Sequence, residues 1–121
     1  MILGLGTDIV EVYRFQEALK RRGDKILTRL FTDDERRACL EAPRRLAARF
    51  AAKEAFVKAL GSGLRGMTWR EVWVQNDALG APRLCCSGRV KAVLQSKGVE
   101  RIHVSLSHSR HYAVAQVILE G

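Results

Sequence analysis

The segment from Pro43 to Leu60 contains the longest regular pattern in the chain and predicts one long helix. Proline is well suited to the first turn of a helix, and the glycine-rich run 61–66 that follows predicts a loop. At about 100° per residue, one apolar stripe of this helix runs through Phe50, while Phe56 points to the opposite side. A helix that is apolar on more than one side is buried on both. We therefore expect it to lie between a sheet and a second layer, either in the same chain or in another subunit.

Shorter elements on both sides of this helix predict the order β-α-α-α-β-β-α-β-β. The predicted strands are 2–11, 69–76, 82–87, 101–108 and 111–119, and the predicted helices are 10–22 ending at Gly23, a short one after the Thr32–Glu35 capping box, 43–60, and 88–97 capped by Ser87. With 121 residues the chain is long enough for one ordinary domain. We expect a single α+β domain over residues 1–121, in which a mostly antiparallel sheet packs on the long helix.

The charge of the chain is strongly positive, with 21 Lys and Arg against 13 Asp and Glu and a net charge of +8. The basic residues concentrate in 14–29 and 43–58. Such a surface suits nucleic acid, a phosphate-rich ligand or an acidic protein. A nucleic-acid-binding module is the less favoured reading, because acids interrupt the basic runs and no known binding motif is present. We see no signal peptide, no membrane span and no cysteine framework, and we expect a cytoplasmic protein.

Two acidic residues stand out because their surroundings are apolar. Asp8 follows an apolar strand that contains Gly4 and Gly6, and Glu54 lies in the Phe50 stripe of the long helix. An isolated buried carboxylate costs several kcal/mol, and two carboxylates that share a site force one of them to bind a proton.

Three arrangements would resolve this cost. Glu54 could pair with Lys53 or Lys58, which flank it on the helix, or Asp8 and Glu54 could form an acid–base pair. Alternatively, both could hold a divalent cation such as Mg²⁺, which favours carboxylate and phosphate oxygens. The lysines would then suit the phosphates of a ligand.

Three stretches together resemble one family: "GLGTDIVEVYRF", "ARFAAKEAFVKALGSG" and "VSLSHSRHYAVAQV". They are similar to blocks of the holo-acyl-carrier-protein synthases, the small bacterial 4′-phosphopantetheinyl transferases, and they occur in the same order over nearly the whole chain. The resemblance implies transfer of the phosphopantetheine arm of coenzyme A to a serine of acyl carrier protein, with release of adenosine 3′,5′-bisphosphate. It also implies Mg²⁺, a role in fatty acid biosynthesis, and a homotrimer with each active site between two subunits.

The resemblance also implies roles for individual residues. Asp8 and Glu54 would bind the metal and act in catalysis together with Lys58. The other implied groups are coenzyme A contacts at Arg49, Lys53, Lys58, Gly61, His108 and Ser109, and carrier-docking residues at Arg14, Arg21, Arg22 and Lys25. Val57 departs from the pattern, because some members have a serine there, and this puts one hydrogen bond to the ligand in doubt.

Several alternatives remain open at this point. A coenzyme A or nucleotide binder without catalytic activity would bind the ligand and transfer nothing. The acidic cluster 33–35 is a rival source of a catalytic base, although negative charge at a helix N-terminus explains it more simply. We do not expect a histidine metal site. We expect Trp69 and Trp73 to lie on one face of a strand, in the core or an interface.

Overall fold

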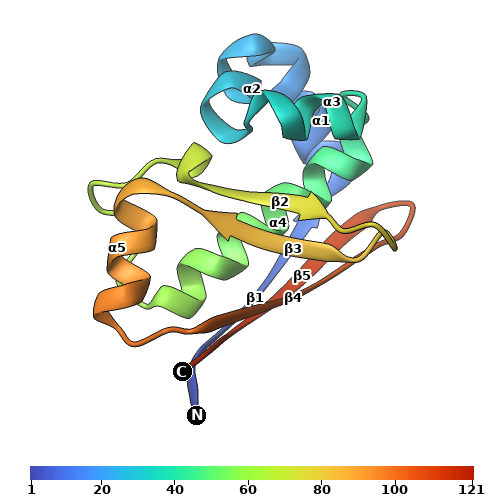
Figure 1. The fold of residues 1–121 in the computed structure, drawn as a ribbon. Helices are drawn as coiled ribbons and strands as arrows, with labels where there is room; N and C mark the ends of the chain where they lie inside the picture. The colour runs from blue at the N-terminus through green and yellow to red at the C-terminus, as the bar shows by residue number, and fades with distance from the viewer.

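The long helix α4 (Pro43–Leu60) lies between two antiparallel sheets in the structure, a computed structural model that describes residues 1–121 (Figure 1). One sheet has the strand order β1 (Ile2–Glu11), β5 (Tyr112–Glu120), β4 (Arg101–His108). The other is the hairpin of β2 (Val72–Asn76) and β3 (Pro82–Cys86). The expected α+β class and the bounds of α4 are confirmed. The predicted single sheet is in fact two, and the hairpin covers the second apolar side of α4 within the same chain.

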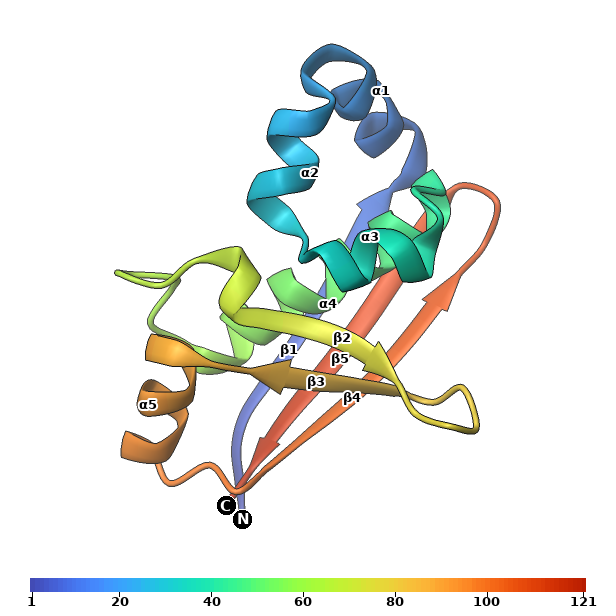
Figure 2. The same ribbon diagram turned by 45° about the horizontal axis from the view of Figure 1, so that its top comes forward.

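Three short helices pack on the N-terminal half of α4 and form what we call the helical lobe (Figure 2). They are α1 (Val12–Arg22), α2 (Asp24–Leu30) and α3 (Asp33–Cys39). Phe15, Leu27 and Phe31 of this region form a second core with Leu46 of α4. The sequence analysis missed α2, because Gly23 was interpreted only as the end of a helix. Gly23 has φ +47°, and this left-handed conformation lets the chain turn at once from one helix into the next.

The capping box predicted at the start of α3 is present. The backbone N–H of Glu35 donates to Thr32 Oγ1 over 3.2 Å, and the N–H of Thr32 donates to Glu35 Oε1 over 3.1 Å. The two bonds satisfy N–H groups that a helix start leaves without intrahelical partners. The helix ends at Cys39, with Leu40 as its C-cap, and Pro43 begins α4 as expected.

The prediction of one strand over 69–76 is wrong at its beginning. Residues Trp69–Glu71 form a 3₁₀ turn, and the strand begins at Val72, so the two tryptophans do not share a strand face. The turn arises because the Glu71 carboxylate accepts from the N–H of Thr68 over 2.9 Å. Glu71 also accepts from the N–H of Arg89 over 2.7 Å, at the start of α5 (Gly88–Ser96). Glu71 therefore caps α5, whereas the predicted cap, Ser87, makes no side-chain capping bond.

The two glycines of β1 allow this strand to lie directly against α4. A Cβ atom on Gly6 would overlap the carbonyl oxygen of Ala55, and one on Gly4 would overlap that of Ala59. Because alternate residues of a strand share a face, Gly4, Gly6 and Asp8 all point toward α4. The glycines thus bring the Asp8 carboxylate up against the long helix.

None of the helices combines the length and the apolar character that a membrane span requires.

Candidate functional site

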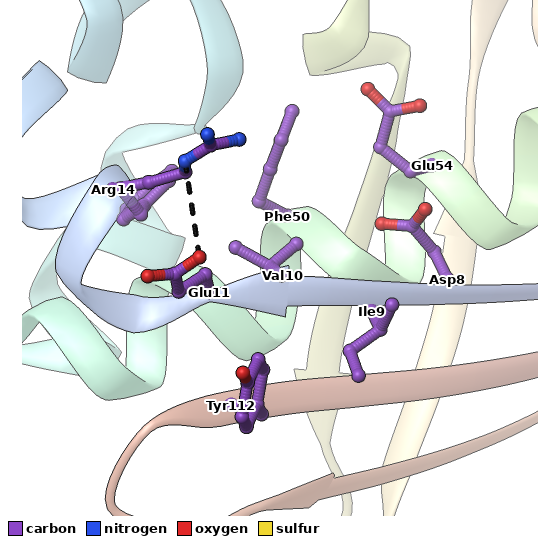
Figure 3. Close-up of a pocket in the computed structure, with 9 residues that line it drawn as sticks. Asp8, Ile9, Val10, Glu11, Arg14, Phe50, Glu54 and Tyr112 are labelled. Atoms are coloured by element: carbon purple, nitrogen blue, oxygen red, sulfur yellow. Dashed lines mark ion pairs between the residues drawn. The ribbon is translucent and has the colours of Figure 1, made fainter.

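A pocket of about 610 Å³ opens beside the edge strand β1 and contains both acids singled out in the sequence (Figure 3). Its lining comes from β1, α1, α4 and the start of β5: Asp8, Ile9, Val10, Glu11, Arg14, Phe15, Phe50, Glu54 and Tyr112. Figure 3 shows the Asp8 and Glu54 side chains on the same side of β1, with Phe50 next to them. The pocket therefore has a polar part with two carboxylates and an apolar part made by aromatic and aliphatic side chains.

Asp8 is mostly buried, and its partner is a lysine one helical turn beyond Glu54. The Lys58 ammonium donates to Asp8 Oδ1 over 2.9 Å and to the carbonyl oxygen of Thr7 over 3.0 Å. The Asp8 side chain is 15% exposed and that of Lys58 is 54% exposed. Because Lys58 faces solvent, its positive charge is available to a ligand that approaches Asp8.

Glu54 has no hydrogen-bond or ion-pair partner in the structure, so the first of the three alternatives, pairing with a lysine, does not hold. Lys58 pairs with Asp8 instead, and Lys53 pairs with Glu35. Partial burial raises the pKa of Glu54, and the negative charge of Asp8 raises it further, while Lys58 acts in the opposite direction. An unpaired carboxylate beside a second carboxylate is an arrangement that a bound cation would stabilise.

The donor set at this point fits Mg²⁺. Both candidate ligands are carboxylates, and no third acidic, histidine or cysteine side chain joins them. Mg²⁺ is commonly bound by one or two carboxylates and takes its other ligands from water and from substrate phosphates. A pair of carboxylates at the wall of an open pocket leaves room for such ligands.

The helical wheel was wrong about how deeply each side of α4 is buried. Glu54, Phe50 and Val57 are only half-buried, whereas Lys53 is completely buried. The closest packing occurs on the alanine-rich side, where Ala55 contacts β1. Small side chains let neighbouring layers approach the helix axis, and the wheel does not contain that information.

Two residues expected at coenzyme A phosphates lie elsewhere. Lys53 is 0% exposed, and its ammonium donates to Leu30 O, Glu35 Oε1 and Trp69 O, which uses all three of its N–H groups. Arg49 is also buried, and its Nη1 lies 3.0 Å from Cys39 Sγ. Neither lines the carboxylate pocket. The structure therefore brings neither residue to the carboxylate pocket, and their contacts with coenzyme A stay predictions.

Gly61, His108 and Ser109 are also not brought to this pocket within one chain. Gly61 ends α4 with φ +78° and is exposed. His108 ends β4 and is paired with Ala113 of β5, which separates β4 from β1. With about 4.8 Å between neighbouring strands, β4 lies roughly 10 Å from β1. Ser109 is in the β4–β5 turn, where its N–H donates to Tyr112 O over 2.8 Å.

The predicted docking residues divide into two groups. Arg21, Arg22 and Lys25 line one hollow at the surface of α1 and α2, together with Ile26 and Arg29. Arg14 lies in the carboxylate pocket instead, 3.8 Å from Glu11. Arg29 belongs to the basic run 14–29 noted in the sequence but was not among the individual docking residues predicted, although its helical spacing from Lys25 is a signal that includes it.

The aromatic side of the pocket was also missed. Phe15 and Phe50 stack with ring centroids 5.7 Å apart, and Tyr112 enters the pocket because β5 pairs it with Glu11. Nothing local in the sequence around Tyr112 indicates that pairing.

Taken together, these features define a class: a small α+β protein with a carboxylate pair, a solvent-facing lysine and a basic hollow on α1 and α2, suited to a phosphate-bearing ligand. The family model described as the 4′-phosphopantetheinyl transferase superfamily matches residues 4–117. A curated holo-[acyl-carrier-protein] synthase of Trichlorobacter lovleyi is 52% identical over 125 residues, which cover 100% of this chain and 99% of the relative.

Solved structures agree with the sequence comparison. The crystal structure of the holo-[acyl-carrier-protein] synthase from Neisseria meningitidis matches with a TM-score of 0.92 at 36% identity, covering 100% of both chains. That of the Helicobacter pylori enzyme in complex with coenzyme A matches with a TM-score of 0.88 at 27% identity, covering 96% of this chain and 99% of that one. The chain belongs to the holo-[acyl-carrier-protein] synthases of the 4′-phosphopantetheinyl transferase superfamily.

Proposed function

We propose that the chain transfers 4′-phosphopantetheine from coenzyme A to a serine of apo acyl carrier protein with Mg²⁺ held by Asp8 and Glu54, and that it releases adenosine 3′,5′-bisphosphate. The metal proposal rests on the Glu54 carboxylate. This group is half-buried beside Asp8, and no lysine or arginine side chain pairs with it. The relative from Helicobacter pylori in complex with coenzyme A supports the identity of the donor.

The residues of the pocket suit this reaction on physical grounds. Transfer of a phosphoryl group depends mainly on positioning and on neutralising charge at the phosphate oxygens. Bound Mg²⁺ would supply most of that neutralisation, and Lys58 adds a positive charge next to Asp8. We infer that Glu54, or a water that it holds, accepts the proton of the attacking serine.

Intact-mass spectrometry of apo acyl carrier protein, incubated with this protein, coenzyme A and Mg²⁺, tests the proposal. We expect the mass of one phosphopantetheine to be added, adenosine 3′,5′-bisphosphate to form in equal amount, and both to be absent with EDTA. Binding of coenzyme A without any mass change would indicate a binder without catalytic activity. Without either result, salt-dependent binding of duplex DNA would favour a nucleic-acid module.

We further propose that the basic hollow of α1 and α2 docks the acidic carrier protein. The double variant Arg21→Glu/Lys25→Glu should raise the KM for carrier protein about tenfold or more, because it replaces attraction by repulsion at the docking surface. The KM for coenzyme A should stay within about twofold. Steady-state kinetics at low ionic strength measure both values, since salt screens exposed charges.

The variant Arg83→Glu/Lys91→Glu is the matched control, because it makes the same change in net charge on β3 and α5. An equal rise in the KM for carrier protein in both variants would show that only net charge matters, and the docking site would be wrong.

We also propose a homotrimer. The face of the three-stranded sheet that points away from α4 exposes Leu3, Leu5, Ile9 and Tyr112, with exposed fractions of 42%, 58%, 62% and 47%. An apolar face of this kind is typical of an interface. Assembly through it is also a way to bring His108 and Ser109 of one subunit to the pocket of another, since they do not reach the pocket of their own chain.

Light scattering at micromolar concentration should give a mass three times the 13.6 kDa of one chain. The mass of a single chain would contradict the trimer. The cytoplasmic location and the role in fatty acid biosynthesis also remain predictions.

A further inference from the structure

The most deeply buried charges of the molecule lie outside the pocket, where the helical lobe meets α4. The side chains of Lys53 and Glu35 are both fully buried, and their charged groups are 2.7 Å apart. Burying two charges is costly unless every polar group finds a partner. Neither residue takes part in the reaction described above, so catalysis does not explain why this ion pair is buried.

These two side chains connect five segments of the chain. The Lys53 ammonium, from α4, donates over 2.5 Å to Leu30 O at the end of α2, and over 3.1 Å to Trp69 O in the 3₁₀ turn. Glu35, in α3, accepts from the N–H of Val74 in β2 over 3.0 Å, in addition to its capping bond with Thr32. Apart from the bond between Lys53 and Glu35 themselves, every hydrogen bond of these two side chains is made to a backbone group.

Apolar packing by itself defines the position of the lobe poorly. The second core consists of apolar side chains such as Leu27 and Phe31, and the hydrophobic effect that holds them has no preferred direction. Helices α2 and α3 have only seven residues each, so each makes few contacts. Hydrogen bonds are directional, and a buried polar group left without a partner is penalised. Only one placement of α2 and α3 on α4 satisfies the whole set of bonds around Lys53.

This placement matters for the reaction because the helical lobe carries the basic hollow proposed to dock the carrier protein, whereas α4 carries the Glu54 carboxylate. Lys25 and Arg29 of the basic hollow are on α2, which ends at Leu30, the residue that Lys53 holds. Glu54 is the next residue after Lys53 on α4, and its side chain points into the carboxylate pocket. The pair thus stands between the docking surface and the metal-binding carboxylates.

We propose that Lys53 and Glu35 are positioning residues that fix the carrier-docking surface of the helical lobe relative to Asp8 and Glu54. The proposal rests on the proposed function for its effect on catalysis, but the placement of the lobe is a structural property that can be measured without any substrate. The pair carries no net charge, so it acts through geometry and not through attraction of the carrier protein.

The experiment separates the stability of the protein from the position of the lobe. The variant Lys53→Met/Glu35→Leu removes both charges together and keeps similar volumes, so no charge is left unpaired. The carbonyl oxygens of Leu30 and Trp69 and the N–H of Val74 lose their partners, so the melting temperature should fall moderately. We expect amide hydrogen exchange over residues 24–39 to become at least tenfold faster, while exchange in the central part of α4 changes little. The KM for carrier protein should rise about fivefold or more, and the KM for coenzyme A should stay within twofold.

The control is Leu94→Ala in α5, a buried position in the core cluster that contains no residue of the helical lobe. It should lower the melting temperature but leave the KM for carrier protein and the exchange of 24–39 unchanged. If the double variant fails to fold, Glu35→Gln takes its place, because the amide keeps the shape of the side chain but cannot accept from both Val74 and Lys53. Glu35→Gln should also raise the KM for carrier protein about fivefold or more and leave the KM for coenzyme A within twofold.

Parent-like exchange over 24–39 and a parent-like KM for carrier protein in the folded variant would overturn the proposal. So would an equal rise in KM in the Leu94→Ala control, because the effect would then be a general result of lower stability. If the parent protein transfers no phosphopantetheine, the proposed function fails, and hydrogen exchange alone decides whether the pair positions the lobe.

Discussion

Replacing Asp8 by asparagine should lower the rate of phosphopantetheine transfer about 10²–10³-fold, the range observed when one electrostatic contact to a transition state is removed. Asparagine retains the shape of the side chain but removes one of only two carboxylates available to Mg²⁺. Glu54→Gln should have an effect of similar size. Intact-mass spectrometry over time, at increasing Mg²⁺ concentration, should show that the variants need much more metal for half-maximal rate.

The folded state should tolerate both substitutions. The Asp8–Lys58 ion pair reaches solvent through the half-exposed lysine, and such pairs contribute about 0–1 kcal/mol. A loss of activity therefore reports on the site and not on unfolding. The matched control is Glu11→Gln in the same pocket, because Glu11 pairs with Arg14 and is not expected to bind metal. Its rate should stay within about threefold of the parent rate. Full activity of Asp8→Asn in the presence of EDTA would end the metal proposal.

The largest effect on stability is expected for Gly6→Ala, which should reduce the free energy of unfolding by about 3 kcal/mol or more, at the upper end of the cost of overpacking. The added Cβ would overlap the carbonyl oxygen of Ala55, in the middle of α4. A backbone carbonyl in a long helix cannot rotate away as a flexible side chain can, so the strand and the helix must separate. Urea denaturation followed by circular dichroism measures the loss.

The neighbouring substitution Thr7→Ala is the control, because the side chain of Thr7 points away from α4. It should change stability by no more than about 0.5 kcal/mol, as is typical of surface positions. Any Gly6→Ala protein that still folds should also lose activity, because Asp8 is two residues along the same strand face and would move away from Glu54. A Gly6→Ala variant with parent-like stability and activity would contradict the close packing of β1 on α4.

The local elements of this fold could largely be predicted from the sequence. The bounds of α4 and the Thr32–Glu35 capping box were correct, because proline, glycine and a threonine–glutamate spacing act through neighbouring backbone groups. The pair of carboxylates was also found, since an acid in apolar surroundings is conspicuous in the sequence itself. By contrast, α2 was missed and the 69–76 strand was overextended, because Gly23 and Glu71 each act in a way that depends on the segment that follows.

The sequence by itself determined four of the five α-helices, most of the strands, the glycine face of β1 and the two acids of the pocket, because these depend on residues close together in the chain. Only the tertiary structure decided which lysine forms an ion pair with which acid. Lys58 meets Asp8 across 50 residues, and Lys53 meets Glu35 across 18, so that one lysine faces solvent beside Asp8 and the other is buried beneath the lobe. On the helix Lys53 directly precedes Glu54 and Lys58 follows it by one turn. Their different roles follow from the layers that pack on each side of α4, and no periodicity within the helix contains that information.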